Sequence, residues 1–101
     1  MTLEEMQKRA YENKINKGFN VTNVEHEFCM MHGEMAEAYE AYTKNKDDLG
    51  EELADVAIFL LGLSEILGYN LHDEITNKMD KNEKRVYKEV EGLKIKLKVE
   101  E

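Results

Sequence analysis

The sequence predicts an all-α domain: a four-helix, bundle-like fold that ends in a short C-terminal strand or tail. The chain of 101 residues has no proline and only six glycines, and 42% of it is hydrophobic. Apolar residues recur at three- and four-residue spacing through most of the sequence, which is the period of a helix with one buried face. A chain of this length forms one domain. We expect residues 1–90 to be the helical domain and residues 91–101 the tail.

The first two helices are expected to begin at capping boxes, in which a Thr and a Glu three residues later satisfy free backbone N–H groups. Thr2-Leu-Glu-Glu5 opens the first helix, which should end near Gly18. Thr22-Asn-Val-Glu25 opens the second, which should run to about Thr43. The spacing of one stripe on the second helix predicts its core face, formed by Phe28, Met31, Met35, Ala38 and Tyr42.

The third helix should run from Asp48 to Gly68 after a polar turn at residues 44–47. It is apolar on almost every side and is therefore expected to be central. A fourth helix should begin after Asn70 and continue to about Lys88. Beyond Gly92 the pattern changes to alternation, which predicts a strand or a basic, apolar tail. A strand would need a partner, and a second copy of the chain is the simplest one; its apolar positions are Leu93, Ile95, Leu97 and Val99.

Composition excludes several classes of protein. The formal net charge of −8 argues against a surface that binds DNA or RNA duplexes. A nucleotide ligand stays compatible with it, because bound Mg²⁺ would reverse the local charge. The single cysteine, Cys29, cannot form an internal disulfide, which favours the cytoplasm. The start of the chain lacks a secretory pattern, and the longest apolar run, Val56–Leu63, is too short to span a membrane.

Two pairs of acidic residues lie within apolar stretches of predicted helix, and their spacing predicts a metal site. Glu34 and Glu37 are three residues apart, as are Glu52 and Asp55, so each pair leans over one helix face. The intervening residues suffice to end one helix, turn and return the second pair against the first. Four facing carboxylates repel one another unless a cation lies between them, and an all-oxygen ligand set suits Mg²⁺ or Mn²⁺. Solvated surface acids are the simpler explanation for the glutamates, but Asp55 directly precedes an apolar run and fits that explanation poorly.

The acid pairs and two further segments resemble the MazG-like superfamily of all-α nucleoside triphosphate pyrophosphohydrolases. Members show E-x-x-E, a gap of similar size and E-x-x-D, as Glu34-x-x-Glu37 and Glu52-x-x-Asp55 do here. The segment 13–19, Asn-Lys-Ile-Asn-Lys-Gly-Phe, and the segment 78–85, Lys-Met-Asp-Lys-Asn-Glu-Lys-Arg, are similar to elements of one MazG-like branch. The resemblance covers about residues 10–87. After Arg85 the chain departs from that branch, whose members often continue with Pro and a His-Gly segment.

This resemblance implies Mg²⁺-dependent cleavage of a nucleoside triphosphate to the monophosphate and pyrophosphate. Glu37 is the expected general base, with Glu34 and Glu51 as alternatives, and Glu34, Glu37, Glu52 and Asp55 are the expected metal ligands. Cations and amides of the similar segments are expected to bind substrate, and aromatic rings are candidates to stack on the base. The substrate-binding candidates are Asn13, Lys17, Phe19, Tyr39, Phe59, Lys78, Lys81, Asn82 and Arg85.

Two other functions remain open from the sequence. One is a non-catalytic helical dimer that senses a nucleotide or binds a partner protein, and the other is a purely structural bundle. In all of them the apolar surface of the third helix is too large for one short chain to cover. We therefore expect a homodimer or a dimer of dimers with a helical interface.

Overall fold

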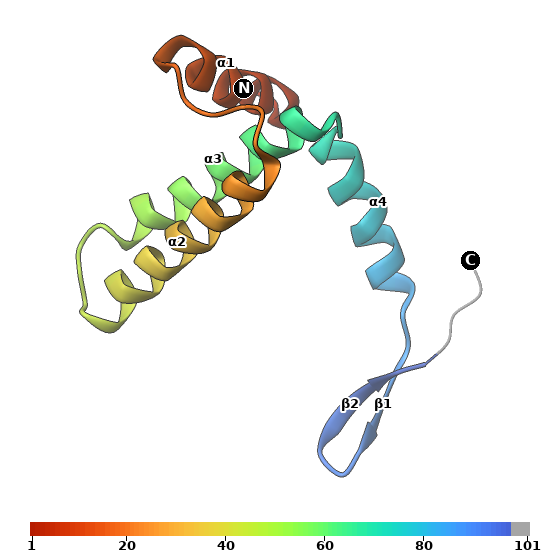
Figure 1. Ribbon diagram of the computed structural model, residues 1–101. Coiled ribbons are helices and arrows are strands. Elements are labelled where there is room, and N and C mark those ends of the chain that lie inside the picture. Colours follow the sequence, from red (N-terminus) through yellow and green to blue (C-terminus); the bar gives the residue numbers. More distant parts are fainter. Residues whose placement is uncertain (98–101) are drawn as a thin grey trace. The chain divides into compact units, whose positions relative to one another are not determined.

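Four helices and a C-terminal hairpin make up the computed structural model, which describes residues 1–97 (Figure 1). The helices are α1 (Leu3–Lys17), α2 (Val24–Thr43), α3 (Leu49–Leu67) and α4 (Leu71–Lys84). Two short strands follow, β1 (Tyr87–Val90) and β2 (Leu93–Lys96). The chain divides into two compact units, residues 1–71 and the residues from His72 onward. The predicted all-α, bundle-like fold with a short C-terminal strand element is confirmed.

The ends of α1 and α3 follow the sequence signals closely. Thr2 and Glu5 form the predicted capping box, with two reciprocal backbone-to-side-chain bonds of 3.1 Å. Gly18 and Gly68 end α1 and α3 in the left-handed conformation, at φ of 71° and 80°. A residue with a Cβ is strained in that conformation, which explains glycine at both positions.

The start of α2 differs from the prediction by one residue. Its N-cap is Asn23, whose side chain accepts a hydrogen bond from the His26 N–H at 3.0 Å, and not Thr22. The reason lies in the preceding loop, where Asn20 Oδ1 accepts hydrogen bonds from the N–H groups of Thr22 and Asn23. That turn holds Thr22 outside the helix and leaves the Asn23 side chain to cap it.

The first unit is organised around α3, as its apolar sequence predicts. Helix α3 packs against both α2 and α1, and Figure 1 shows α2 and α3 running side by side in opposite directions. The most deeply buried apolar residues lie on this central helix and on the facing side of α2: Ala38, Ala41, Leu61 and Leu63.

The predicted core face of α2 is wrong for three of its five residues. Ala38 is buried and Met31 is half-buried, but Phe28, Met35 and Tyr42 are 44%, 54% and 66% exposed. The side of α2 that faces α3 is the neighbouring stripe, which begins at Glu27 and includes Glu34 and Ala41. Small alanines let the two helices approach closely, so the seam forms there and the large apolar side chains lie outside it.

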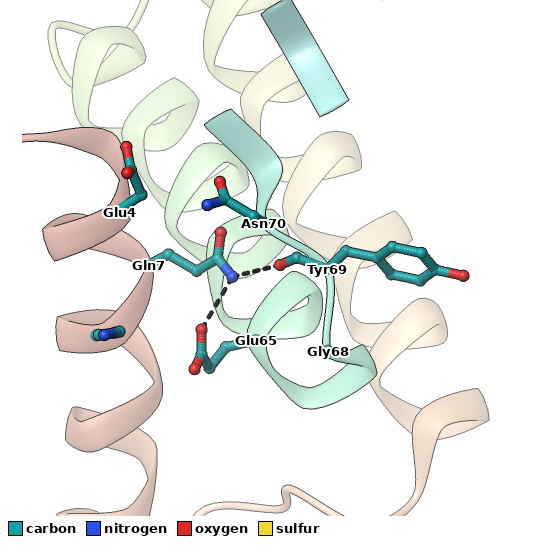
Figure 2. Close-up of a pocket in the computed structure, with 7 residues that line it drawn as sticks. Glu4, Gln7, Glu65, Gly68, Tyr69 and Asn70 are labelled. Carbon is teal, nitrogen blue, oxygen red and sulfur yellow. Dashed lines mark hydrogen bonds between the residues drawn. The ribbon is translucent and has the colours of Figure 1, made fainter. Parts of the chain in front are cut away.

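A buried glutamine joins α1 to the end of α3. Gln7 Nε2 donates to the Tyr69 carbonyl oxygen at 2.6 Å and to Glu65 Oε2 at 2.9 Å, as Figure 2 shows. Its Oε1 accepts from the N–H of Leu71, the first residue of α4, at 3.0 Å. The N–H groups in the first turn of a helix have no partner within that helix. The Gln7 carboxamide of α1 therefore accepts a hydrogen bond from one such N–H group at the start of α4.

The second unit differs from the sequence prediction in the end of α4 and in the partner of the C-terminal strand. Helix α4 ends at Lys84 and not near Lys88, because β1 begins at Tyr87. The predicted strand after Gly92 exists, but it pairs with β1 of its own chain, in antiparallel register from Tyr87–Lys96 to Val90–Leu93. Glu91 and Gly92, both at positive φ, form the two-residue turn that this register requires. Val99, the last apolar position of the predicted strand, lies outside the described residues.

Candidate metal and nucleotide site

Three of the four predicted acids converge at the seam between α2 and α3. Glu34 and Glu37 come from the middle of α2, and Glu52 comes from the first turn of α3. One carboxylate oxygen from each lies within 4.8 Å of the others. Because α2 and α3 are antiparallel and joined by a short turn, the second half of α2 lies opposite the first half of α3. The fold thus brings Glu52 to within reach of Glu34 and Glu37, which lie fifteen or more residues before it in the sequence.

Burial and the charges of neighbouring acids disfavour the charged form of Glu34 and of Glu52. Burial raises the pKa of Glu34 above its ordinary value, and the charges of Glu37, Asp55 and Glu52 raise it further. The pKa of Glu52 is also raised, first by burial and then by Asp48, Glu37 and Asp55, while Lys46 acts in the opposite sense. Asp55 is exposed and lies outside the group of three, but it is close enough to contribute to both shifts.

The donor set fits a divalent hard cation. Glu52 Oε2 is shielded from solvent and has no hydrogen-bond partner among residues 1–97. A shielded carboxylate oxygen without a partner is costly unless a cation or donor occupies the adjacent space. Within the same residues, neither Lys nor Arg forms an ion pair with Glu34, Glu37 or Glu52. Carboxylate oxygens are the ligands that Mg²⁺ and Mn²⁺ prefer, so this cluster could hold either ion.

The remaining predicted site residues lie in several places. Glu51 is exposed in the first turn of α3, outside the cluster. Asn13 lines a hollow beside α3, Lys17 ends α1, and Phe19 and Tyr39 are 56% and 68% exposed. Phe59 is half-buried, with the ammonium group of Lys14 4.5 Å from its ring centre. The phosphate-binding candidates all belong to the second unit: Lys78, Lys81 and Asn82 lie on α4, and Arg85 directly follows it.

Sequence reasoning missed a buried ion pair next to this site. Lys14 of α1 pairs with Glu27 of α2, and their side chains are 14% and 3% exposed. Asn20 Nδ2 donates to the second oxygen of Glu27 at 3.1 Å. Glu27 lies two turns before Glu34 on the same stripe, and that spacing was a signal for a third inward-facing acid.

Comparison with known protein families gives a match over most of the chain. The sequence model of the MazG-like family matches residues 17–100 of this chain. These residues include both acid pairs, all of α2, α3 and α4, and the hairpin. The chain belongs to the MazG-like family. Membership suggests a nucleotide pyrophosphohydrolase type of function and a nucleotide substrate, and MazG-like proteins typically depend on a metal ion. The comparisons with curated proteins and with solved structures give no match. Among the described residues, no helix is long and apolar enough to cross a membrane.

Proposed function

We propose that this MazG-like chain hydrolyses a nucleoside triphosphate to the nucleoside monophosphate and pyrophosphate. The observation that carries the proposal is the convergence of Glu34, Glu37 and Glu52, with a shielded and unpartnered oxygen on Glu52. A structural bundle gains nothing from such a cluster, because its carboxylates repel one another. A triphosphate substrate with its divalent cation removes that repulsion.

Glu34, Glu37, Glu52 and Asp55 are the residues that would hold Mg²⁺, or Mn²⁺ in its place. When bound, the cation neutralises phosphate charge and lowers the pKa of a coordinated water. Glu37 is the proposed general base, because it is the exposed member of the cluster and a solvent water can reach it. Glu34 is half-buried in the seam and less accessible to solvent water than Glu37, so it is assigned to holding the cation.

The basic residues of the second unit are proposed to bind phosphate oxygens. Lys78 and Lys81 carry ammonium groups and Asn82 an amide, all exposed, and the half-buried Arg85 offers a planar fork of donors. Each stabilises negative charge that grows on the leaving pyrophosphate. Arg85→Ala and Lys78→Ala should therefore slow turnover more than they weaken metal binding.

The test is a screen of nucleoside triphosphates with Mg²⁺ or Mn²⁺ in which pyrophosphate and orthophosphate are measured separately. Pyrophosphate should be the first product. Glu37→Gln should lower the rate by about 10²–10⁴, the usual contribution of a general base. Glu40→Gln is the matched control, since Glu40 lies one turn further along α2 and pairs with Lys44 outside the cluster.

Two results would contradict the proposal. Orthophosphate released first would indicate cleavage at the γ phosphate. Binding of metal and nucleotide with no turnover of any triphosphate would favour the alternative, a nucleotide-sensing or partner-binding helical dimer. Equal Mg²⁺ affinity of the wild type and the Glu37→Gln, Asp55→Asn double variant would place the metal elsewhere.

A further inference from the structure

The C-terminal hairpin has one apolar face and one charged face. In an antiparallel pair, directly opposed residues point to the same side of the sheet, and successive pairs alternate between the two sides. The Leu97 N–H donates to the Val86 carbonyl oxygen at 2.7 Å, which extends the ladder of β1 and β2 by one pair. The apolar face therefore consists of Val86, Val90, Leu93, Ile95 and Leu97, with Lys88 among them. The charged face consists of Tyr87, Glu89, Lys94 and Lys96.

The apolar face of the hairpin is open to solvent. Its aliphatic side chains are between 40% and 69% exposed, and neither β1 nor β2 contains a buried residue. Helix α4, in the same unit, contains none either. A two-stranded hairpin is at best marginally stable in water unless further strands or a helix cover its apolar side. This face therefore needs a partner that buries it.

The chemistry of the face selects an apolar partner and not a charged one. Lys88 is its one ionisable member among the described residues, and the long stem of Lys88 lets the ammonium group reach water at the edge of β1. The ion pair of the hairpin, between Lys94 and Glu89 at 3.6 Å, belongs to the opposite face. A phosphate backbone or an acidic peptide would gain little from a surface of Val, Leu and Ile side chains. The aliphatic face of another sheet would match it, because two such faces pack about 10 Å apart with interdigitating side chains.

A second copy of the chain supplies such a face in equal number. The hairpin is part of every folded chain, so its cover must be present at the same concentration as the chain itself. Another copy always meets this condition. The same face used by both copies gives a contact with two-fold symmetry, in which each hairpin buries the other.

Face-to-face packing satisfies the hairpin better than pairing along a strand edge. Addition of one hairpin to the edge of another would leave the apolar face of both copies exposed. Two β2 strands paired antiparallel about Ile95 would also place Lys94 of each copy opposite Lys96 of the other. Like charges directly opposed across a strand pair are destabilising, and lysines on an edge strand are a usual protection against such pairing.

The hairpin contact is too small to hold two chains together by itself. A patch of this kind covers roughly a few hundred Å² on each copy, whereas a stable interface buries about 1,200–2,000 Å² in total. The exposed apolar residues of α2, such as Phe28 and Met35, offer a second interface in the first unit. A dimer built on the helices carries two hairpins, so two such dimers make two hairpin contacts, the second within an assembly that the first has already formed. Two interfaces with two-fold symmetry close into a tetramer.

We propose that the apolar face of the hairpin is an assembly interface, which packs against the same face of a second copy and joins two helix-built dimers into a tetramer. Leu93, the most exposed of its aliphatic residues at 69%, and Ile95, in the middle of the face on β2, carry the contact. The inference goes beyond the proposed function and does not rest on hydrolysis, because assembly is measured without a nucleotide.

The first experiment is sedimentation equilibrium of the full chain over a range of micromolar concentrations. The Leu93→Thr, Ile95→Thr double variant removes the apolar contact and keeps residues that favour a strand. The wild type should form a tetramer, and the variant should dissociate to dimers with a tetramer dissociation constant raised by about tenfold or more. Lys94→Thr, Lys96→Thr is the matched control, on the same strand and the opposite face, and should change that constant by about twofold or less.

The second experiment keeps the hairpin intact and maps which faces meet. In a Cys29→Ser background, Ile95→Cys places a thiol on the apolar face, and Lys94→Cys places one on the charged face. A short thiol-specific cross-linker should give covalent dimers with Ile95→Cys. With Lys94→Cys the yield should stay at the level of the Cys29→Ser background.

Four outcomes would overturn the proposal. Wild-type sedimentation of the Leu93→Thr, Ile95→Thr variant would show that the face takes no part in assembly. Equal cross-linking of Ile95→Cys and Lys94→Cys would show that the hairpins do not meet through the apolar face. A wild type that is monomeric at every concentration would show that its own chain covers the hairpin. Loss of the dimer together with the tetramer would assign the hairpin to the helix-built interface and remove the second one.

Discussion

Breaking the buried pair between Lys14 and Glu27 should strongly destabilise the first unit. Glu27 is 3% exposed and is held by Lys14 on one oxygen and by Asn20 on the other. Lys14→Met retains the aliphatic stem but leaves the Glu27 carboxylate buried without its cation. Removal of one partner from a buried pair typically costs about 3–5 kcal/mol. The cation–π contact with Phe59, worth about 0.5–2 kcal/mol, is lost as well.

The reverse change, Glu27→Gln, should destabilise the fold less. The Lys14 side chain is 14% exposed and flexible, so its ammonium group can move toward water, whereas Glu27 on α2 cannot. The double variant Lys14→Met, Glu27→Gln removes both charges and should be more stable than Lys14→Met alone.

The assay is urea unfolding followed by circular dichroism at one fixed protein concentration, since self-association would make stability depend on concentration. In a thermal melt of a domain of this size, a loss of about 3 kcal/mol in the free energy of unfolding lowers Tm by roughly 12 °C or more. Lys44→Met is the matched control, because Lys44 pairs with Glu40 on the surface, where such pairs contribute only about 0–1 kcal/mol. A loss below about 1 kcal/mol in Lys14→Met, or no recovery in the double variant, would refute this account of the pair.

Three further predictions follow from the fold and the acids. Gln7→Glu should lower the free energy of unfolding by about 2–3 kcal/mol in urea titration, because a carboxylate cannot donate to the Tyr69 carbonyl or to Glu65; stability equal to wild type would show that the Gln7 contacts are replaceable. In metal-free protein the raised pKa values of Glu34 and Glu52 mean that the folded state binds more protons than the unfolded state between the ordinary value of 4.5 and the raised values, so stability should rise as pH falls through that window and decline as pH rises through it. Glu52→Gln should flatten this dependence in thermal melts, and an unchanged pH profile would show that Glu52 does not contribute. The exposed apolar side chains of α2 and α3, Phe28, Met35, Leu53 and Leu60, should be covered by a second copy of the chain, so sedimentation at micromolar concentration should show a dimer or tetramer; a stable monomer would contradict this.

The helices themselves could be predicted from the sequence because their signals are local. A capping box, a glycine at a left-handed position and an apolar period each concern a few neighbouring residues, and α1 and α3 begin and end where those signals lie. The approach of Glu52 to Glu34 and Glu37 could also be predicted, because two helices joined by a short turn run side by side. The end of α4 was missed because Val86 and Tyr87 suit a helix or a strand, and only the Glu91-Gly92 turn decides between them.

The buried polar contacts could not be predicted, because they depend on which helix lies opposite which. Gln7 and Lys14 lie seven residues apart on the inward face of α1, a spacing that periodicity alone interprets as a solvated stripe. Their partners, Glu65 and Glu27, lie on two different helices. The face of α2 was misassigned for a related reason: apolar spacing predicts that one side of a helix is buried, but which side packs against α3 depends on how closely α3 can approach.

Two acids on one stripe of α2 differ in what surrounds their carboxylates, and the difference supports the proposed metal site. Glu27 receives a cation from within the protein, because Lys14 crosses from α1 and Gly62 leaves space for its stem, a Cβ there lying only 3.3 Å from Lys14 Cδ. Glu34, seven residues later, meets only other carboxylates, and its pKa is raised. Both positions face α3, so burial alone does not distinguish them. What distinguishes them is that the chain supplies a counter-charge to one and, among residues 1–97, no ion-pair partner to the other. The fold neutralises one buried glutamate with its own lysine two turns away, and this contrast supports the proposal that the counter-charge of the acid cluster is a bound cation.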